Sequence, residues 1–309
     1  MKYDIKLDNL KKRRTSTDNF FMFGESVSSS PLLESYEKLS EEKPIKYAIG
    51  DMEEVGRKYT LATIEEGERV KKHLKEIDRI EFEYQGSVTN NTHIRDNSDI
   101  DILVITKKYF ALEPPLKPTN PYSGSPNDDL LNLRKECFNI LKDKFPKVKI
   151  DDSGAKSIAL DGGSLKRKVD VVPANWYDTI KYNEEKKRHY RGVEILDKYK
   201  NERILNTPFY HNELLEIKDK NTNQNYKRIV RLLKTLKADS KREISFSSYD
   251  ITAIAYCISN EIYFIENTPL LLIENVLKEL KKLLNSNNTM NLEVPDKSRK
   301  IFDKKEKID

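Results

Sequence analysis

The sequence is poor in the side chains that form disulfides or bind soft metals, because its 309 residues include only two cysteines and four histidines. Cys137 and Cys257 lie far apart in the chain, and their spacing matches no metal-ligand motif. The histidines share no ligand spacing either. This scarcity argues against a disulfide scaffold and against a Cys/His metal site, and it is typical of proteins from a reducing cytoplasm.

Long apolar runs are also missing. The longest near-apolar stretch covers about residues 251–258, whereas a membrane-spanning helix needs roughly 18 such residues. The chain begins MKYDIKLDNLKKRR, which is charged throughout and lacks the apolar core of a secretory signal peptide. We therefore expect a cytoplasmic protein without a membrane span.

Charge is abundant but almost balanced. Charged residues make up 35% of the chain, and 56 Lys and Arg against 51 Asp and Glu leave a net charge of +5. A protein that binds duplex nucleic acid usually carries a concentrated basic face, whereas the basic runs here are scattered along the sequence. The charge pattern therefore does not indicate a nucleic-acid groove, although it leaves open a phosphate-rich ligand such as a nucleotide or RNA.

Hydrophobic periodicity predicts an α+β chain in two parts, with a boundary near Pro208. The first part, residues 1–207, is expected to hold a mixed sheet and a long helix, preceded by a polar segment with one short helix around residues 32–39. The second part, residues 208–309, is expected to be helical. The predicted strands are 79–84, 99–106, 147–151, 156–160 and 165–172, and the predicted helices are 51–77, 130–141, 177–196, 225–237, 248–265 and 270–284.

Three aspartates form the one arrangement in the sequence that indicates a catalytic site. Asp99 and Asp101 lie on a predicted strand, where alternate side chains share a face, and Ile100 between them would point into the core. Two carboxylates this close repel each other, and a divalent cation such as Mg²⁺ or Mn²⁺ relieves the conflict. Asp170, on a later strand, would complete a site for two ions. This arrangement indicates nucleotidyl transfer.

A glycine and a serine precede the aspartates. Gly86 and Ser87 end a predicted strand, and eleven residues separate Ser87 from Asp99. Glycine lets the backbone approach phosphates closely, and the amides that open a following helix would bind them together with the Ser87 hydroxyl. A lone Asp-x-Asp is more often a solvated pair, but the upstream glycine and serine at this spacing make the combination far more specific.

The segments QGSVTNNTHIRDNSDIDILVI (residues 85–105) and KVDVVPA (residues 168–174) resemble the active site of DNA polymerase beta type nucleotidyltransferases. More narrowly, they are similar to the cGAS/DncV-like nucleotidyltransferases (CD-NTases) of bacterial anti-phage systems. The resemblance covers about residues 50–285. It implies a polymerase-beta-like core, a helical C-terminal domain similar to that of oligoadenylate synthase, and a bilobed shape with a central cleft.

The resemblance extends to RIVRLLK (residues 228–234) and FSSYDITAI (residues 246–254). By motif position it implies that Lys234 and Ser248 grip the donor triphosphate and that Tyr249 stacks on a base. Without the resemblance, the simpler interpretations are a solvated lysine on an amphipathic helix, a helix cap and a half-buried core aromatic.

These observations predict an enzyme that joins nucleoside triphosphates (ATP, GTP or pyrimidine nucleotides) into a cyclic di- or trinucleotide messenger with release of pyrophosphate. We expect two Mg²⁺ or Mn²⁺ ions held by Asp99, Asp101 and Asp170, and a monomeric chain. The resemblance implies an effector protein that the product activates in CBASS-type anti-phage defence. Alternatives are synthesis of linear oligoadenylate, transfer to a tRNA or protein acceptor, and a nucleotide-binding scaffold without turnover.

Overall fold

A computed structural model describes residues 2–15, 36, 39–95, 99–265, 268–303 and 307. Contacts between residues divide the chain into two compact units. One, here called the sheet unit, comprises residues 60–89 and 98–213. The other, here called the helical unit, comprises residues 1–59, 90–97 and 214–309. No helix in the described part of the chain is both long and apolar enough to cross a membrane.

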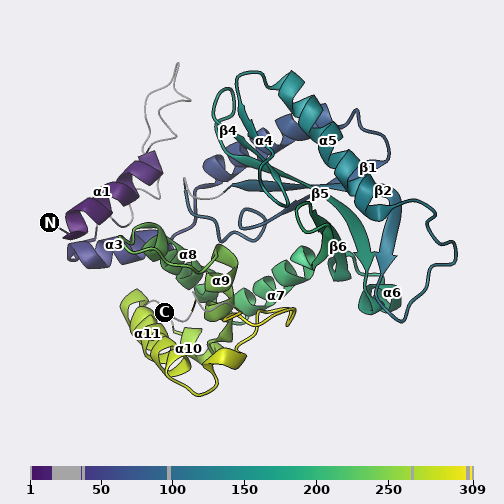
Figure 1. The fold of residues 1–309 in the computed structure, drawn as a ribbon. Coiled ribbons are helices and arrows are strands. Elements are labelled where there is room, and N and C mark those ends of the chain that lie inside the picture. The colour runs from purple at the N-terminus through teal and green to yellow at the C-terminus, as the bar shows by residue number, and fades with distance from the viewer. Residues whose placement is uncertain are drawn as a thin grey trace. The chain divides into compact units, whose positions relative to one another are not determined.

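The sheet unit is built on a seven-stranded mixed sheet (Figure 1). The first five strands lie in the order β1-β2-β5-β4-β3, and β6 joins β5 to β7. The β2–β5 pair is parallel, and the other pairs are antiparallel. The strands are β1 (Ile80–Gln85), β2 (Ile100–Leu112), β3 (Lys149–Asp151), β4 (Ile158–Asp161), β5 (Val169–Asp178), β6 (Arg191–Asp197) and β7 (Glu202–Asn206).

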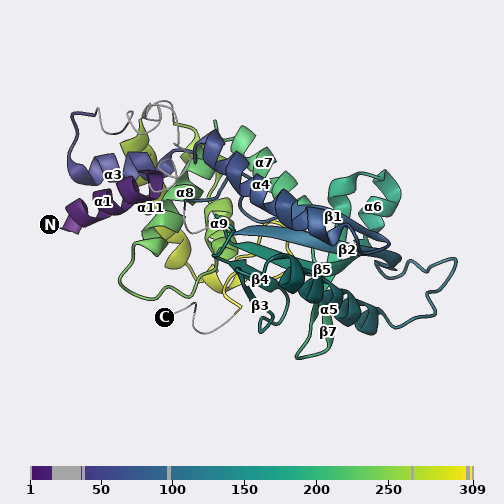
Figure 2. The ribbon, with the colours of Figure 1, turned by 90° about the horizontal axis from the view of Figure 1, so that it is seen from above.

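Each face of the sheet has its own core. Ile100, Ile102 and Val104 of β2 belong to a core with residues of helices α4 (Arg57–Leu74) and α5 (Pro126–Lys144); Figure 2 shows both helices running along the sheet. Leu103 and Ile105 alternate with them and pack in a second core with Val172, Ala174 and Trp176 of β5. Both faces are thus covered at β2, as its apolar run predicted.

The helical unit contains two main apolar clusters. The larger joins Met52, at the end of α3 (Lys43–Met52), to residues of α7 (Pro208–Lys220), α8 (Asn225–Ala238), α9 (Ser248–Cys257), α10 (Asn260–Tyr263) and α11 (Pro269–Leu284). The smaller packs Ala253 of α9 against the C-terminal residues Val294, Ile301 and Phe302. Val294, Ile301 and Phe302 therefore complete a core that begins in α9.

Three predicted helices are wrong in extent or type. The helix predicted at 51–77 is two helices, α3 and α4, because residues 53–56 are non-helical, Glu53 is extended, and Gly56 is unfavourable inside a helix. The helix predicted at 177–196 is instead the end of β5, the short α6 (Ile180–Glu185), the 3₁₀ turn η2 (Arg188–Tyr190) and β6. The helix predicted at 248–265 is interrupted between α9 and α10.

The N-terminal segment also differs from its prediction. Helix α1 (Lys2–Thr15) was not predicted, and most of the helix predicted at residues 32–39 lies outside the described residues. The segment was assigned to the catalytic domain, whereas residues 1–59 group with the helical unit. The physical reason is packing and charge, since Met52 enters the helical core and Arg13 of α1 forms an ion pair, 2.6 Å long, with Asp239 at the end of α8.

Candidate active site

Asp101 and Asp170 are direct neighbours in the register of the parallel strands β2 and β5. Alternation places both on the face of Leu103 and Val172, at the start of that apolar row. Asp99 lies two residues before Asp101, just ahead of β2. Ile100 is 1% exposed and packs on the opposite face, as predicted. The structure thus places the carboxylates of Asp101 and Asp170 together at one end of two adjacent strands.

The three carboxylates share one electrostatic environment. Burial, and then the charges of Asp170 and Asp99, raise the pKa of Asp101 to about 7. The pKa of Asp170 is raised by burial and by Asp99. Burial also raises the pKa of Asp99, and Lys168 opposes this rise. All three groups therefore resist ionisation in the absence of a nearby cation.

The donor set fits a hard divalent cation, because it consists of carboxylate oxygens that carry unfavourable negative charge. Within the described residues, however, no three Asp, Glu, His or Cys side chains are already drawn together as metal ligands. Asp99, Asp101 and Asp170 are the residues that would hold such a cation.

Gly86 lies in the turn after β1 and contacts the same site. Its φ of +84° is a backbone conformation that favours glycine, and a Cβ at this position would lie 2.3 Å from Oδ2 of Asp101. The need for glycine here therefore has two causes, the turn and the closeness of the carboxylate. Ser87 follows in the turn and is half-buried.

The helix expected after Gly86 is not formed, because residues 87–91 make turns. The Asn90 side chain accepts hydrogen bonds from the backbone amide of Thr92 at 3.2 Å and from its hydroxyl at 2.7 Å. Such local bonds compete with a helix, and Asn91 has a φ of +56°. The prediction that phosphate binds to the first amides of a helix here is therefore wrong. The backbone amides of the turn at residues 87–91 are the remaining candidates.

Lys234 is not a solvated lysine. It is 5% exposed, and its ammonium donates to the carbonyl of Thr92 at 2.9 Å and to its hydroxyl at 3.1 Å, both within the helical unit. Burial, and then the charge of Arg231, lower the pKa of Lys234 to about 7. Arg231 binds the same loop, through the carbonyl of Asn91 at 2.9 Å. The two cations of α8 thus bind neighbouring residues, Asn91 and Thr92, of the turn that follows Ser87.

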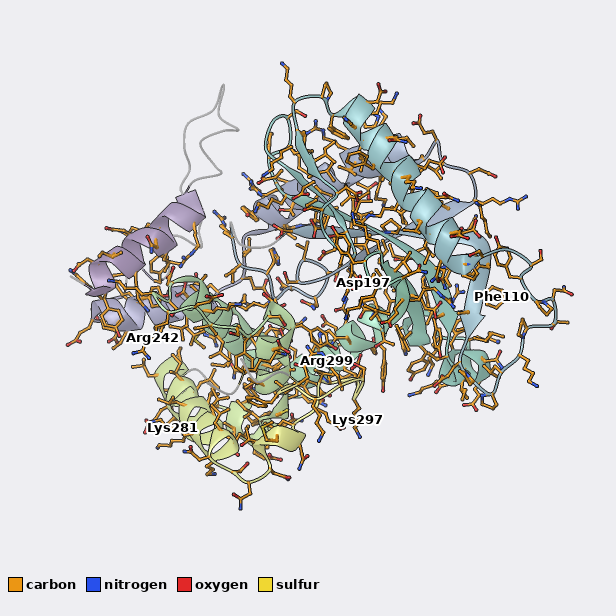
Figure 3. All side chains as sticks on the ribbon, viewed as in Figure 1. Phe110, Asp197, Arg242, Lys281, Lys297 and Arg299 are labelled. Atoms are coloured by element: carbon orange, nitrogen blue, oxygen red, sulfur yellow. The ribbon has the colours of Figure 1, made fainter. Side chains whose placement is uncertain are left out.

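Ser248 and Tyr249 begin α9, but the cap of this helix is Ser247, which forms a capping box with Asp250. Ser248 is exposed, so its hydroxyl is accessible at the N-terminus of the helix. Tyr249 is partly buried against the cluster of Ala253 and the C-terminal residues. The guanidinium of Arg299, labelled in Figure 3, lies 5.2 Å from the centre of the Tyr249 ring.

Ser157 is a residue near the site that no sequence motif indicated. Its hydroxyl donates to Oδ2 of Asp170 at 3.3 Å. Ser157 precedes β4, which pairs with β5 beside Asp170. Only the tertiary pairing of these strands brings the two residues together, so a single sequence offers no local signal for the contact.

A mixed sheet that holds paired carboxylates beside a glycine turn defines a nucleotidyltransferase, the class whose chemistry such sites support. Two family models agree with it. The nucleotidyltransferase domain matches residues 67–206, and the C-terminal helical domain of cGAS/DncV-like nucleotidyltransferases matches residues 213–309.

Similar proteins support the same assignment. The chain is 35% identical to the cyclic dinucleotide synthase CdnE of Yersinia aleksiciae, over 98% of this chain and 87% of that protein. It is similar to the solved STING-associated CdnE c-di-GMP synthase of Capnocytophaga granulosa, with a TM-score of 0.75, 30% identity and coverage of 99% and 92%. It is also similar to the solved STING-associated CdnE c-di-GMP synthase of Flavobacteriaceae sp., with a TM-score of 0.78 and 25% identity. That match covers 98% of this chain and 93% of the other.

The chain therefore belongs to the cGAS/DncV-like nucleotidyltransferase family. This membership confirms the predicted fold class, the nucleotidyltransferase activity and the synthesis of a cyclic nucleotide messenger. It also implies dependence on a divalent metal.

Proposed function

We propose that the protein joins two nucleoside triphosphates into a cyclic dinucleotide and releases pyrophosphate at each of two steps, with Asp99, Asp101 and Asp170 as its catalytic residues. The observation that carries this proposal is the register of Asp101 and Asp170 on adjacent parallel strands. The relatives named as cyclic dinucleotide and c-di-GMP synthases support this product class, with GTP as the first substrate to test.

Asp99 and Asp101 would hold two Mg²⁺ or Mn²⁺ ions, and Asp170 would bind one of them and help to deprotonate the acceptor hydroxyl. Such ions would supply charge that neutralises the triphosphate and lowers the pKa of that hydroxyl. The Gly86-Ser87 turn binds the phosphates of the donor, because the absence of a Cβ lets the backbone approach closely.

The helical part, residues 208–309, supplies further nucleotide contacts in this proposal. In this proposal Ser248, which is exposed at the start of α9, donates to a phosphate, and Tyr249 stacks on a base. Lys234 binds phosphate only if its bonds to Thr92 are released, because its ammonium is occupied there in the structure.

The test is synthesis by the purified full-length chain. Labelled GTP, ATP, CTP and UTP are supplied singly and in pairs with Mg²⁺ or Mn²⁺, and phosphatase-resistant products are identified by mass. We expect a product with the mass of a cyclic dinucleotide, which is lighter by one water than the linear chain with the same phosphates. The double variant Asp99→Asn with Asp101→Asn should make none.

The matched control is Asp143→Asn, because the Asp143 side chain is 74% exposed on α5 and pairs only with its neighbour Lys144 in the described structure. This variant should retain wild-type synthesis. Product formation by the double aspartate variant would contradict the proposed mechanism.

The same assay separates the other functions. Products longer by successive adenylates would indicate linear oligoadenylate synthesis, and label transferred to added tRNA or protein would indicate a different acceptor. Nucleotide binding without any product would indicate a scaffold.

A cyclic nucleotide acts as a messenger only if another protein binds it. We therefore propose that an effector protein, activated by the messenger during phage infection, acts downstream.

A further inference from the structure

The loop of residues 152–157, which leads into β4, converges on a single buried side chain. Arg134 of α5 is 5% exposed and makes five hydrogen bonds to this loop. Its acceptors are the Asp152 carboxylate at 2.6 Å and the carbonyls of Gly154 and Ser157, both at 2.7 Å, with longer bonds to the carbonyls of Asp152 and Ala155 at 3.3 and 3.5 Å. One planar guanidinium thus sets the path of the whole loop.

A second group of contacts holds the loop from β6 and the residues after it. Lys198 donates its side chain to Asp152 and its backbone amide to the carbonyl of Ala155 at 3.1 Å. The Tyr199 hydroxyl donates to the carbonyl of Ser153 at 2.6 Å. The hydrogen-bond partners of this loop, Arg134, Lys198 and Tyr199, all lie outside residues 152–157. The conformation of the loop therefore depends on these distant residues as well as on its own sequence.

The loop ends at Ser157, whose two polar groups face different partners. Its carbonyl accepts from Arg134, and its hydroxyl donates to Oδ2 of Asp170 at 3.3 Å. That hydroxyl makes the only side-chain hydrogen bond to Asp170 found among the described residues. It counteracts the burial and the Asp99 charge that disfavour the Asp170 carboxylate.

We infer that Ser157 is a positioning residue for Asp170 and that Arg134, by clamping the loop, fixes the direction of the Ser157 hydroxyl. Ser157 holds the third carboxylate of the site in one orientation before a metal ion arrives, which lowers the cost of ordering it upon binding. The inference rests on the proposed role of Asp170 as a metal ligand.

The test measures Mn²⁺ binding to the nucleotide-free protein by electron paramagnetic resonance, alongside cyclic product kinetics. Removal of one hydrogen bond predicts that Ser157→Ala weakens Mn²⁺ binding by about three- to tenfold. It should lower kcat with little change in the KM for nucleotide. Ser157→Thr keeps the hydroxyl and should restore both values towards wild type.

Arg134→Lys keeps the charge but loses the fork, and it should reproduce the metal defect of Ser157→Ala. The double variant Ser157→Ala with Arg134→Lys should bind Mn²⁺ no more weakly than either single variant, because both substitutions act through the one hydrogen bond from Ser157 to Asp170. If Arg134→Lys does not fold, the Ala and Thr variants at position 157 still decide the role of Ser157.

Wild-type Mn²⁺ affinity in Ser157→Ala, failure of Ser157→Thr to restore it, or additive losses in the double variant would overturn the inference. Asp170→Asn distinguishes this outcome from a failure of the proposed function. If that variant binds Mn²⁺ as tightly as wild type, Asp170 is not a ligand, whatever Ser157 does.

Discussion

Gly86 approaches Asp101 so closely that a Cβ on residue 86 would lie 2.3 Å from the Oδ2 atom of that aspartate. Gly86→Ala must therefore displace the carboxylate of Asp101, which we propose to be catalytic, as well as strain a backbone with φ of +84°. We expect a loss of synthesis of about a hundredfold, the typical cost of a misplaced reacting group, and a loss of stability of about 1–2 kcal/mol. Product formation and urea unfolding measure the two effects.

Gly162 provides the control, because its φ is +70° and a Cβ there would meet nothing within 4 Å. Gly162→Ala should lose stability by a similar amount and retain synthesis. Equal activity in the two variants would contradict the role assigned to the contact with Asp101.

The raised pKa of Asp101 predicts how the metal-free protein responds to pH. Its folded pKa of about 7 exceeds the reference value of 3.8, so the folded state binds the extra proton and loses stability as pH rises from about 4 to about 7. Asp101 alone should contribute a slope of about 1.4 kcal/mol per pH unit at most. Asp101→Asn should flatten it, as measured by urea unfolding in a chelator.

Asp143→Asn should keep the wild-type slope, since the Asp143 side chain is 74% exposed. Addition of Mn²⁺ at neutral pH should stabilise the wild type more than Asp101→Asn. An unchanged slope in Asp101→Asn would show that Asp101 does not titrate in this range.

Lys234 should make the free energy of unfolding depend on pH in the direction opposite to that expected for Asp101. Its pKa is lowered to about 7 from 10.5, so the unfolded chain binds more protons and stability should rise between about pH 7 and about pH 10. Lys234→Met, which keeps the apolar stem, should remove up to about 1.4 kcal/mol per pH unit of this dependence. Unfolding at several pH values measures it.

Lys278→Met is the matched control, because the Lys278 side chain is 65% exposed on α11. It should leave both the pH dependence and the nucleotide KM unchanged. If Lys234→Met keeps the wild-type pH dependence, the ammonium is solvated in solution; if it also raises the KM, Lys234 contacts nucleotide.

Tyr249 can be tested by separating its ring from its hydroxyl. Tyr249→Phe removes the hydroxyl that contacts Asp296 at 3.5 Å, so it should cost no more than about 1 kcal/mol of stability and leave the nucleotide KM unchanged. Tyr249→Ala removes the ring, so we expect a loss of about 2 kcal/mol or more from packing and, if the ring stacks on a base, a higher nucleotide KM.

Phe302, which is 7% exposed in the same apolar cluster, supplies the comparison. Phe302→Ala should destabilise the protein without raising the KM. A parallel rise in both alanine variants would assign Tyr249 to packing and not to the nucleotide.

The sequence predicted the elements whose signals are local. Strand β2, with Asp101 and Ile100 on opposite faces, follows from alternation, and α8 and α11 follow from helical spacing. Strand β6 (RGVEILD) was missed because its apolar side chains, Val193, Ile195 and Leu196, do not alternate strictly with polar ones, so the segment lacks the period of a strand. The turn at Asn90 was missed because side-chain bonds within the loop replaced the expected helix.

The residues proposed for the site could be predicted from the sequence, but the contacts that hold those residues in place could not. Asp101 and Asp170 could be paired in advance because both lie on strands of one sheet. The burial of Lys234 and the bond from Ser157 to Asp170 depend on contacts between distant segments, and a single sequence carries no local signal for those.

The helical unit is assembled from three separate pieces of chain, residues 1–59, 90–97 and 214–309. Its boundaries therefore differ from those of the matched C-terminal domain, which covers residues 213–309. A chimera that exchanged only that domain with a relative would leave α3 and the loop bound by Arg231 and Lys234 facing foreign partners. We therefore expect such an exchange to keep the contacts at Asn91 and Thr92 only if these residues and α3 are exchanged together with α8.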